Sequence, residues 1–154
     1  MTSQLLVTRH LIVLFKRDLD RLKWELEQYK NEANLWVVQE GISNCAGNLA
    51  LHLTGNLNHF IGATLANTGY VRQRDLEFSQ KNIPLSAILE SIEDTKQMIE
   101  QSLLQLTQGD LEKEYRRNPF EDYMTTEYFL LHLLTHLSYH IGQINYHRRL
   151  LTKE

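Results

Sequence analysis

The sequence has little of several features on which particular classes of protein depend. It has one cysteine, Cys45, in 154 residues, so it cannot form an internal disulfide and is not a secreted disulfide scaffold. We therefore expect a reducing compartment, most simply the cytoplasm. The apolar run at residues 11–15 is followed at once by charged residues, and it is far shorter than the roughly 20 residues of a membrane-spanning helix. We expect neither a signal peptide nor a membrane anchor.

An excess of charge of one sign is also absent. The chain has 16 Lys and Arg against 19 Asp and Glu, a formal net charge of -3, and the two signs are mixed along its whole length. No basic stripe is available to hold a phosphate backbone, so we do not expect nucleic acid as a partner. A length of 154 residues fits one domain that can bury its own core. We expect a single domain over residues 1–154.

What the sequence does contain is helical periodicity. Apolar residues recur in steps of three, four and seven, as they do on amphipathic helices. This spacing predicts helices over residues 3–30, 48–66, 84–109 and 125–150. Pro84 suits a first helical turn, Gly109 a left-handed C-terminal cap, and Thr125 an N-terminal cap. Four helices without a strand pattern of any length predict an all-α fold, a four-helix bundle.

The predicted connections are unequal in length. Residues 31–47 contain two glycines and read as a loop, with a short strand-like piece at 35–38. Residues 67–84 and 110–125 form two longer connections, which suggests a crossover or functional role for them. Simple up-down-up-down wiring is therefore not favoured.

Histidines supply the strongest functional signal. His136 and His140 are four residues apart, which on a helix places their Cβ atoms about 5–6 Å apart and lets both imidazoles reach one ion. His132 would lie about 12 Å from His140 along the helix, too far to share that ion. A third ligand must come from another helix, and the second helix offers both His52 and His59, seven residues apart on one edge. Spacing alone leaves both open.

Inert, hydrogen-bonded histidines are the competing interpretation, which we adopt for His10 and His147. For the pair His136 and His140 we favour a metal site. No Glu follows His136, so the metalloprotease motif H-E-x-x-H is absent. The sequence also has no Glu-x-x-His pair, which argues against a di-iron bundle. No C-x-x-C occurs either. What remains is a mononuclear, nitrogen-rich site with open coordination positions.

Three segments carry a resemblance to a known family. Asn48-Leu-Ala-Leu-His-Leu-Thr-Gly-Asn56 and His136-Leu-Ser-Tyr-His-Ile-Gly-Gln-Ile144 resemble the DinB-like superfamily of metal-binding four-helix bundles. The charged segment Tyr70-Val-Arg-Gln-Arg-Asp-Leu-Glu-Phe78 resembles its DUF1572 branch. The common form of the second segment has Arg where this chain has Ile141. The likeness extends over nearly the whole chain in length and helix order.

This resemblance implies several properties that spacing does not. It implies His52 rather than His59 as the third ligand, and hence a His52, His136, His140 triad for a divalent ion, with nickel or zinc expected. It also implies a bundle of DinB/YfiT type with up-down-down-up wiring, and a homodimer. Relatives include thiol-dependent S-transferases and isomerases, so we expect a metal-dependent enzyme that activates a low-molecular-weight thiol, or water, towards a small electrophile. The alternatives are a metal-dependent hydrolase and a non-catalytic dimeric bundle with a structural or sensory metal.

Four further residues are candidates for binding substrate. Arg72 and Arg74 can hold a carboxylate of an acidic substrate, or they can form salt bridges within a surface loop. Gln143 lies three residues after His140 and can orient a ligand or water. Asn56, from the first of the three segments, completes the set. Trp36 can cover the pocket or serve as a packing residue.

Overall fold

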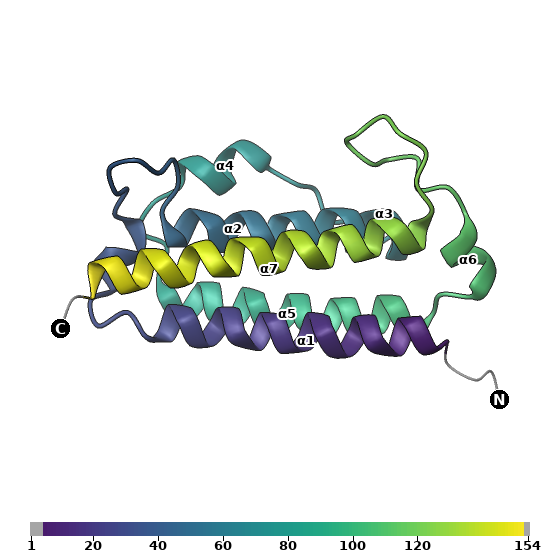
Figure 1. Ribbon diagram of the computed structural model, residues 1–154, viewed down its shortest axis with the longest axis horizontal. Helices are drawn as coiled ribbons and strands as arrows, with labels where there is room; N and C mark the ends of the chain where they lie inside the picture. Colours follow the sequence, from purple (N-terminus) through teal and green to yellow (C-terminus); the bar gives the residue numbers. More distant parts are fainter. Residues whose placement is uncertain (1–4, 153–154) are drawn as a thin grey trace.

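The computed structural model describes residues 5–152 and is all-helical over that range, with four long helices (Figure 1). No strand occurs among these residues, and Glu114 and Thr125 form an isolated antiparallel bridge. The expected start of the first helix at Ser3 lies outside the described residues. In chain order the elements are α1 Leu6–Glu27, η1 Glu32–Trp36, α2 Ala46–Leu57, η2 Asn58–Ala63, α3 Thr64–Ala66, α4 Arg74–Ser79, α5 Leu85–Leu104, α6 Gln108–Glu112 and α7 Thr126–Leu151.

The four long helices surround one hydrophobic core. α1 packs against α5 and α7, and α2 packs against the same two helices. α1 and α7 run in one direction in Figure 1, whereas α2 and α5 run in the other. The apolar stripe of α1 is fully buried because its residues recur at helical spacing. Its innermost members are Phe15, Leu19, Leu22 and Leu26.

The second helical segment is continuous from Ala46 to Ala66 but is not uniform. Its middle part, η2, is a π-helix of six residues, Asn58–Ala63, between α2 and α3. The segment ends at Asn67, which has the left-handed φ of 51° that asparagine tolerates better than most residues. π-turns inside α-helices are frequent at functional sites. Here the π-turn directly follows α2, the helix that carries His52.

The end of the third predicted helix was wrong. α5 ends at Leu104, and Gly109 does not cap it but lies inside the short helix α6, with no positive φ. Thr107 accounts for the change, because its side chain and that of Asp110 form a capping box that starts a new helix. The Thr125 cap was right: its hydroxyl accepts a hydrogen bond from the backbone N–H of Tyr128 at 3.1 Å.

Two predicted loops contain helical turns instead. The strand-like piece at residues 35–38 was wrong, because its first part belongs to the 3₁₀-helix η1. The ring of Trp36 lies so close to Gly47 that a Cβ there would meet it at 2.6 Å, so this tryptophan packs on the start of α2. The long connection 67–84 contains α4, which lies over α2 (Figure 1). α4 thereby reaches the part of α2 that carries His52.

Over the part of the chain that the structure describes, no helix combines the length and the apolar character that crossing a bilayer requires.

Candidate metal centre

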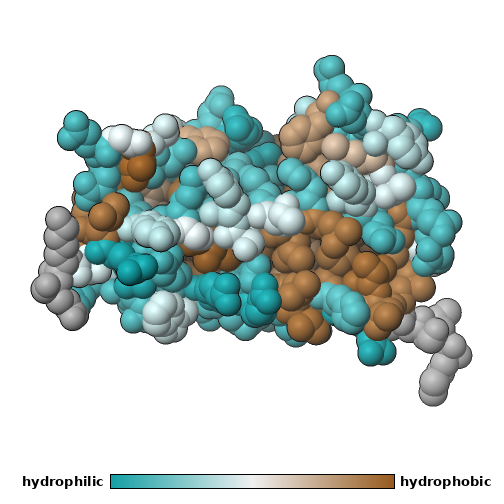
Figure 2. All heavy atoms as spheres, viewed as in Figure 1, coloured by the Kyte–Doolittle hydropathy of each residue, from teal (hydrophilic) through white to brown (hydrophobic). Residues whose placement is uncertain are grey.

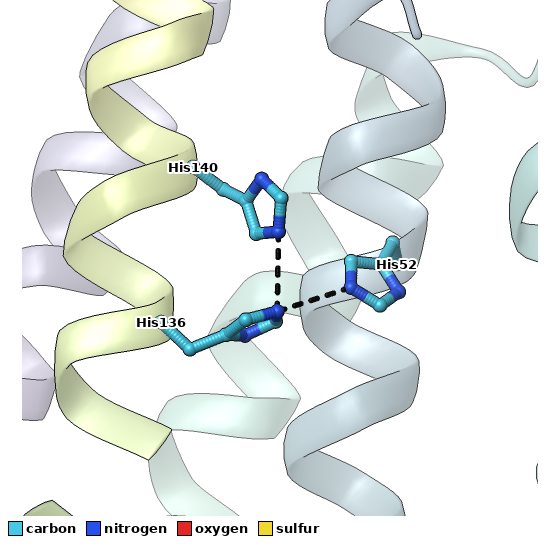
Figure 3. Close-up of side chains that lie close together, drawn as sticks. All are labelled: His52, His136 and His140. Carbon is cyan, nitrogen blue, oxygen red and sulfur yellow. Dashed lines mark hydrogen bonds between the residues drawn. The ribbon is translucent and has the colours of Figure 1, made fainter. Parts of the chain in front are cut away.

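Three imidazoles from two helices meet between α2 and α7 (Figure 3). His52 projects from α2, and His136 and His140 project from successive turns of α7. The Nε2 atom of His136 lies 3.3 Å from Nε2 of His52 and 3.1 Å from Nε2 of His140. One ring nitrogen from each residue lies within 4.8 Å of the others. The structure thus brings together the three histidines that the resemblance implied.

In His52 and His140, the hydrogen bond of Nδ1 determines the tautomer of the ring and directs Nε2 towards the cluster. His52 Nδ1 lies 3.0 Å from Oε1 of Glu77, and a carboxylate can only accept, so Nδ1 carries the proton. His140 Nδ1 lies 2.7 Å from Oε1 of Gln143, whose amide nitrogen donates to the hydroxyl of Tyr139. In their neutral forms both rings therefore present Nε2 to the cluster as an unprotonated acceptor. This is the arrangement that orients histidine ligands around metals.

The two separations that involve His136 Nε2, 3.3 Å to His52 and 3.1 Å to His140, match those of ligands on a tetrahedral ion. Bonds of about 2.0–2.1 Å at tetrahedral angles place two ligand nitrogens about 3.3 Å apart. Lone pairs at such distances repel one another unless positive charge lies between them, either a proton or a metal ion. His52, His136 and His140 therefore fit a divalent transition ion with at least one coordination position left over.

A proton is the weaker candidate for that positive charge. Burial, followed by the neighbouring imidazoles of His140 and His52, lowers the pKa of His136 from 6.5 to about 3. Burial also lowers the pKa of His140, and the Gln143 hydrogen bond only partly offsets it. Both side chains are consequently neutral near pH 7, the state in which imidazole binds metals. The other nitrogen of His136, Nδ1, is buried and has no hydrogen-bond partner among the described residues.

Glu77 is the acidic residue behind His52. Its side chain is buried, and Arg72 binds it through two hydrogen bonds of 2.9 Å, one from Nε and one from Nη2. Burial alone would raise the pKa of Glu77, but the hydrogen bonds from His52 and Arg72 outweigh burial and the pKa is lowered. Glu77 is thus an anion held on the side of His52 that faces away from the cluster.

Two residues of α2 determine how closely α4 approaches. The side-chain amide of Asn48 donates to the carbonyls of Glu77 at 2.9 Å and Gln80 at 2.8 Å, which holds the end of α4. Gly55 leaves the space that the Glu77 carboxyl fills, since a Cβ at Gly55 would lie 2.6 Å from Cδ of Glu77. A larger residue at 55 would push the carboxyl away from His52.

The other histidines lie outside the cluster. His147 is buried with both nitrogens paired, to the Tyr29 hydroxyl at 2.6 Å and to the Val37 carbonyl at 2.7 Å. It is therefore an inert core histidine, as expected. His10 is exposed. His59 belongs to η2 and packs against the ring of Phe60, and burial followed by the charge of Arg72 lowers its pKa.

The candidate substrate-binding residues have diverse surroundings. Arg72 is committed to Glu77, and its side chain is 12% exposed. The Arg74 guanidinium lies over the ring of Phe78 at 5.2 Å. Asn56 is buried one turn after His52, and its Oδ1 has no partner in the described part of the chain. Gln143 accepts a hydrogen bond from Nδ1 of His140, one of the three clustered histidines.

Sequence reasoning missed Glu77 as a partner of His52. The residue lies in a segment that the sequence analysis took as a charged loop, where it is one of two acids, with Asp75. A usable signal was present, because metal-binding histidines commonly donate their second N–H to a carboxylate. Arg72 and Glu77, five residues apart, then read as an internal ion pair that positions this carboxylate. The sequence spacing did not indicate which histidine it would serve.

Comparison with known proteins identifies a family whose function is unknown. The model of the family described as "Protein of unknown function (DUF1572)" matches residues 2–154. No curated protein matches the chain.

Replacing Gly55 by alanine should disrupt the contact between Glu77 and His52. Overpacking of this kind costs about 1–3 kcal/mol of the free energy of unfolding, measured by denaturation in urea. Gly142→Ala is the matched control, because a Cβ at Gly142 meets nothing within 4 Å. That variant should instead gain up to about 1 kcal/mol from helix propensity. Equal effects of the two substitutions would contradict the packing described.

The stability of the metal-free protein should decrease as the pH is lowered. Unfolded His136 titrates near 6.5 and folded His136 near 3, so between these values the unfolded state binds more protons. The free energy of unfolding should therefore be highest above pH 6.5 and fall continuously towards pH 3. In urea titrations, His136→Gln should make this dependence shallower, while His10→Gln, at an exposed position, should leave it unchanged. Identical slopes for both variants would refute this assignment.

Proposed function

Because the chain belongs to the DUF1572 family, whose function is unknown, we propose a function from the site itself: a mononuclear metal centre that activates a small thiol or water. The convergence of three imidazoles, with Nε2 separations of 3.1 and 3.3 Å, is the observation that carries the proposal. Three protein ligands leave a coordination position open, which is the arrangement of catalytic rather than structural sites. The expected ion is nickel or zinc, since both accept imidazole ligands.

The residues around the ion have separate tasks in this proposal. His52, His136 and His140 hold the ion and leave one side open to a ligand. Glu77 accepts a hydrogen bond from His52 Nδ1–H and makes that ring a stronger metal ligand, while Arg72 keeps Glu77 ionised. When bound, a divalent ion supplies Lewis acidity, which lowers the pKa of a thiol or water ligand. Among the described residues no carboxylate joins the histidine cluster as a free general base, since Glu77 is bound by Arg72 and His52.

A thiol is the preferred nucleophile, and the argument for it is family resemblance. We propose that the fold is a four-helix bundle of DinB/YfiT type with up-down-down-up wiring, which the packing of α1 and α2 on α5 and α7 supports. A thiol with a pKa near 8.5 needs less activation than water and no added base. This favours thiol transfer over hydrolysis at a site without a free carboxylate.

Metal content tests the proposal directly. After incubation with zinc or nickel and extensive dialysis, elemental analysis should find about one ion per chain. His136→Ala should lose it, whereas His59→Ala, which removes a histidine outside the cluster, should retain it. Glu77→Gln should weaken binding by about 10- to 100-fold, because the second N–H of His52 loses its anionic acceptor. Retention of the ion by His136→Ala would contradict the proposed ligands.

The same preparations, loaded with cobalt, separate the functional alternatives. Adding 2-mercaptoethanol should change the visible absorption of the cobalt protein, and ethylene glycol, its oxygen analogue, should not. A response to neither, with metal that only raises the melting temperature, would identify a structural or sensory site and overturn the enzyme proposal. Hydrolysis of simple esters without a response to thiol would favour the hydrolase instead.

We also propose that the chain forms a homodimer through an apolar surface on α1 and α7. Leu6 and Val13 are each 63% exposed and Leu131 is 42% exposed. Figure 2 shows hydrophobic residues gathered where the first halves of α1 and α7 lie side by side. Clusters of this kind on a protein surface commonly mark interfaces. Val13 is the most direct residue to alter, because it is central in the first half of α1.

Light scattering after size exclusion should give twice the chain mass of 18.1 kDa for the unaltered protein. Val13→Glu should halve that mass by placing a charge in the interface. Val71→Glu is the control, since Val71 is 81% exposed on the connection before α4 and should leave the mass unchanged. A monomer at every concentration would exclude the dimer.

A further inference from the structure

A groove of about 670 Å³ lies beside the histidine cluster and shares His140 with it. Its walls are the loop 41–44, Leu49 of α2 and the C-terminal half of α7. The volume falls within the range of about 300–1,000 Å³ that is typical of sites for small molecules. The hydrogen bonds from Tyr139 through Gln143 to His140 run along this wall and join it to the cluster. A molecule in the groove therefore lies next to a candidate ligand of the metal.

The groove is free of charged side chains. None of its lining residues is Asp, Glu, Lys or Arg, in a chain in which 23% of residues are charged. Its histidines add no available charge, because His147 is paired at both nitrogens and His140 directs Nε2 into the cluster. Another cavity, at the α5–α6 end, is lined by both acids and bases, Asp110 and Arg117 among them. An ion in the groove would lose water without gaining a counter-ion.

The surface of the groove suits an apolar or aromatic body. Tyr139 and Tyr146 line the groove and are 65% and 66% exposed, so their aromatic side chains are accessible to a molecule bound there. Gly142 lies between them on the same face of α7, and nothing lies within 4 Å of where its Cβ would be. Glycine inside a helix costs up to about 1 kcal/mol relative to alanine. Without a side chain, this glycine leaves the floor of the groove open.

We propose that this groove binds an uncharged small molecule with an apolar or aromatic body, as the second substrate of the metal centre. That the bound molecule is a substrate rests on the proposed function. That a molecule binds here rests on the groove alone. It also separates two kinds of chemistry in space. The Arg72 and Glu77 charges lie behind His52, and the groove on the His140 side receives neutral material. Arg149 contacts the Tyr146 ring at 5.6 Å but does not line the groove.

Two dyes that differ only in charge test the inference. N-phenyl-1-naphthylamine is neutral, and 8-anilino-1-naphthalenesulfonate has the same ring system with a sulfonate added. Fluorescence titration of the full chain should give at least a tenfold lower Kd for the neutral dye. Gly142→Leu, which fills the open floor, should raise the Kd of the neutral dye at least tenfold. Ser138→Leu adds the same side chain one turn earlier, at an exposed position that does not line the groove, and should have no effect.

Each other outcome counts against the groove. Equal or tighter binding of the sulfonate would show that the site takes anions, and insensitivity to Gly142→Leu would place the dye elsewhere. Loss of a dimer in Gly142→Leu, seen by light scattering, would assign this surface to a second copy instead. Because His136 does not line the groove, His136→Ala should still bind the neutral dye. Failure of the metal centre and failure of the groove are therefore distinguishable.

Discussion

The hydrogen bond between His52 and Glu77 is the interaction on which the site depends. A buried carboxylate is costly unless it is fully paired, and Arg72 supplies two hydrogen bonds to it while His52 supplies a third. These contacts tie α4 to α2 and determine which nitrogen of His52 faces α7. Without Glu77 the ring could take either tautomer, and the cluster would lose its common orientation. The lack of a side chain at Gly55 makes this approach possible.

The arrangement separates charge from the groove in which we propose substrate binding. The anion and its arginine lie behind one ligand, and the groove beyond His140 contains only neutral side chains. An ion held by three neutral imidazoles keeps its full positive charge towards an open position, apart from the distant influence of Glu77. In the function that we propose, such a centre would bind an anionic thiolate and receive an uncharged partner from the other side. The two reactants would then have separate places.

Residue spacing predicted part of this architecture and failed at definable points. His136 and His140 follow from a four-residue step on a long amphipathic helix, and four long helices follow from periodicity. His52 did not follow from spacing, because a regular helical period puts His52 and His59 on one edge, whereas a π-turn begins at Asn58. Which histidine Glu77 contacts could not be predicted, because that contact depends on a six-residue helix, α4, whose packing on α2 is a tertiary effect.

X-ray absorption at the metal edge tests the central claim most directly, because it measures the ligands themselves. For the protein loaded with zinc or nickel, the account predicts a shell of nitrogen and oxygen at about 2.0–2.1 Å, with the multiple scattering of three imidazoles. In His52→Ala one imidazole should be missing from that pattern. A shell of oxygen atoms alone, or a spectrum unchanged by His52→Ala, would contradict a metal centre built on His52, His136 and His140.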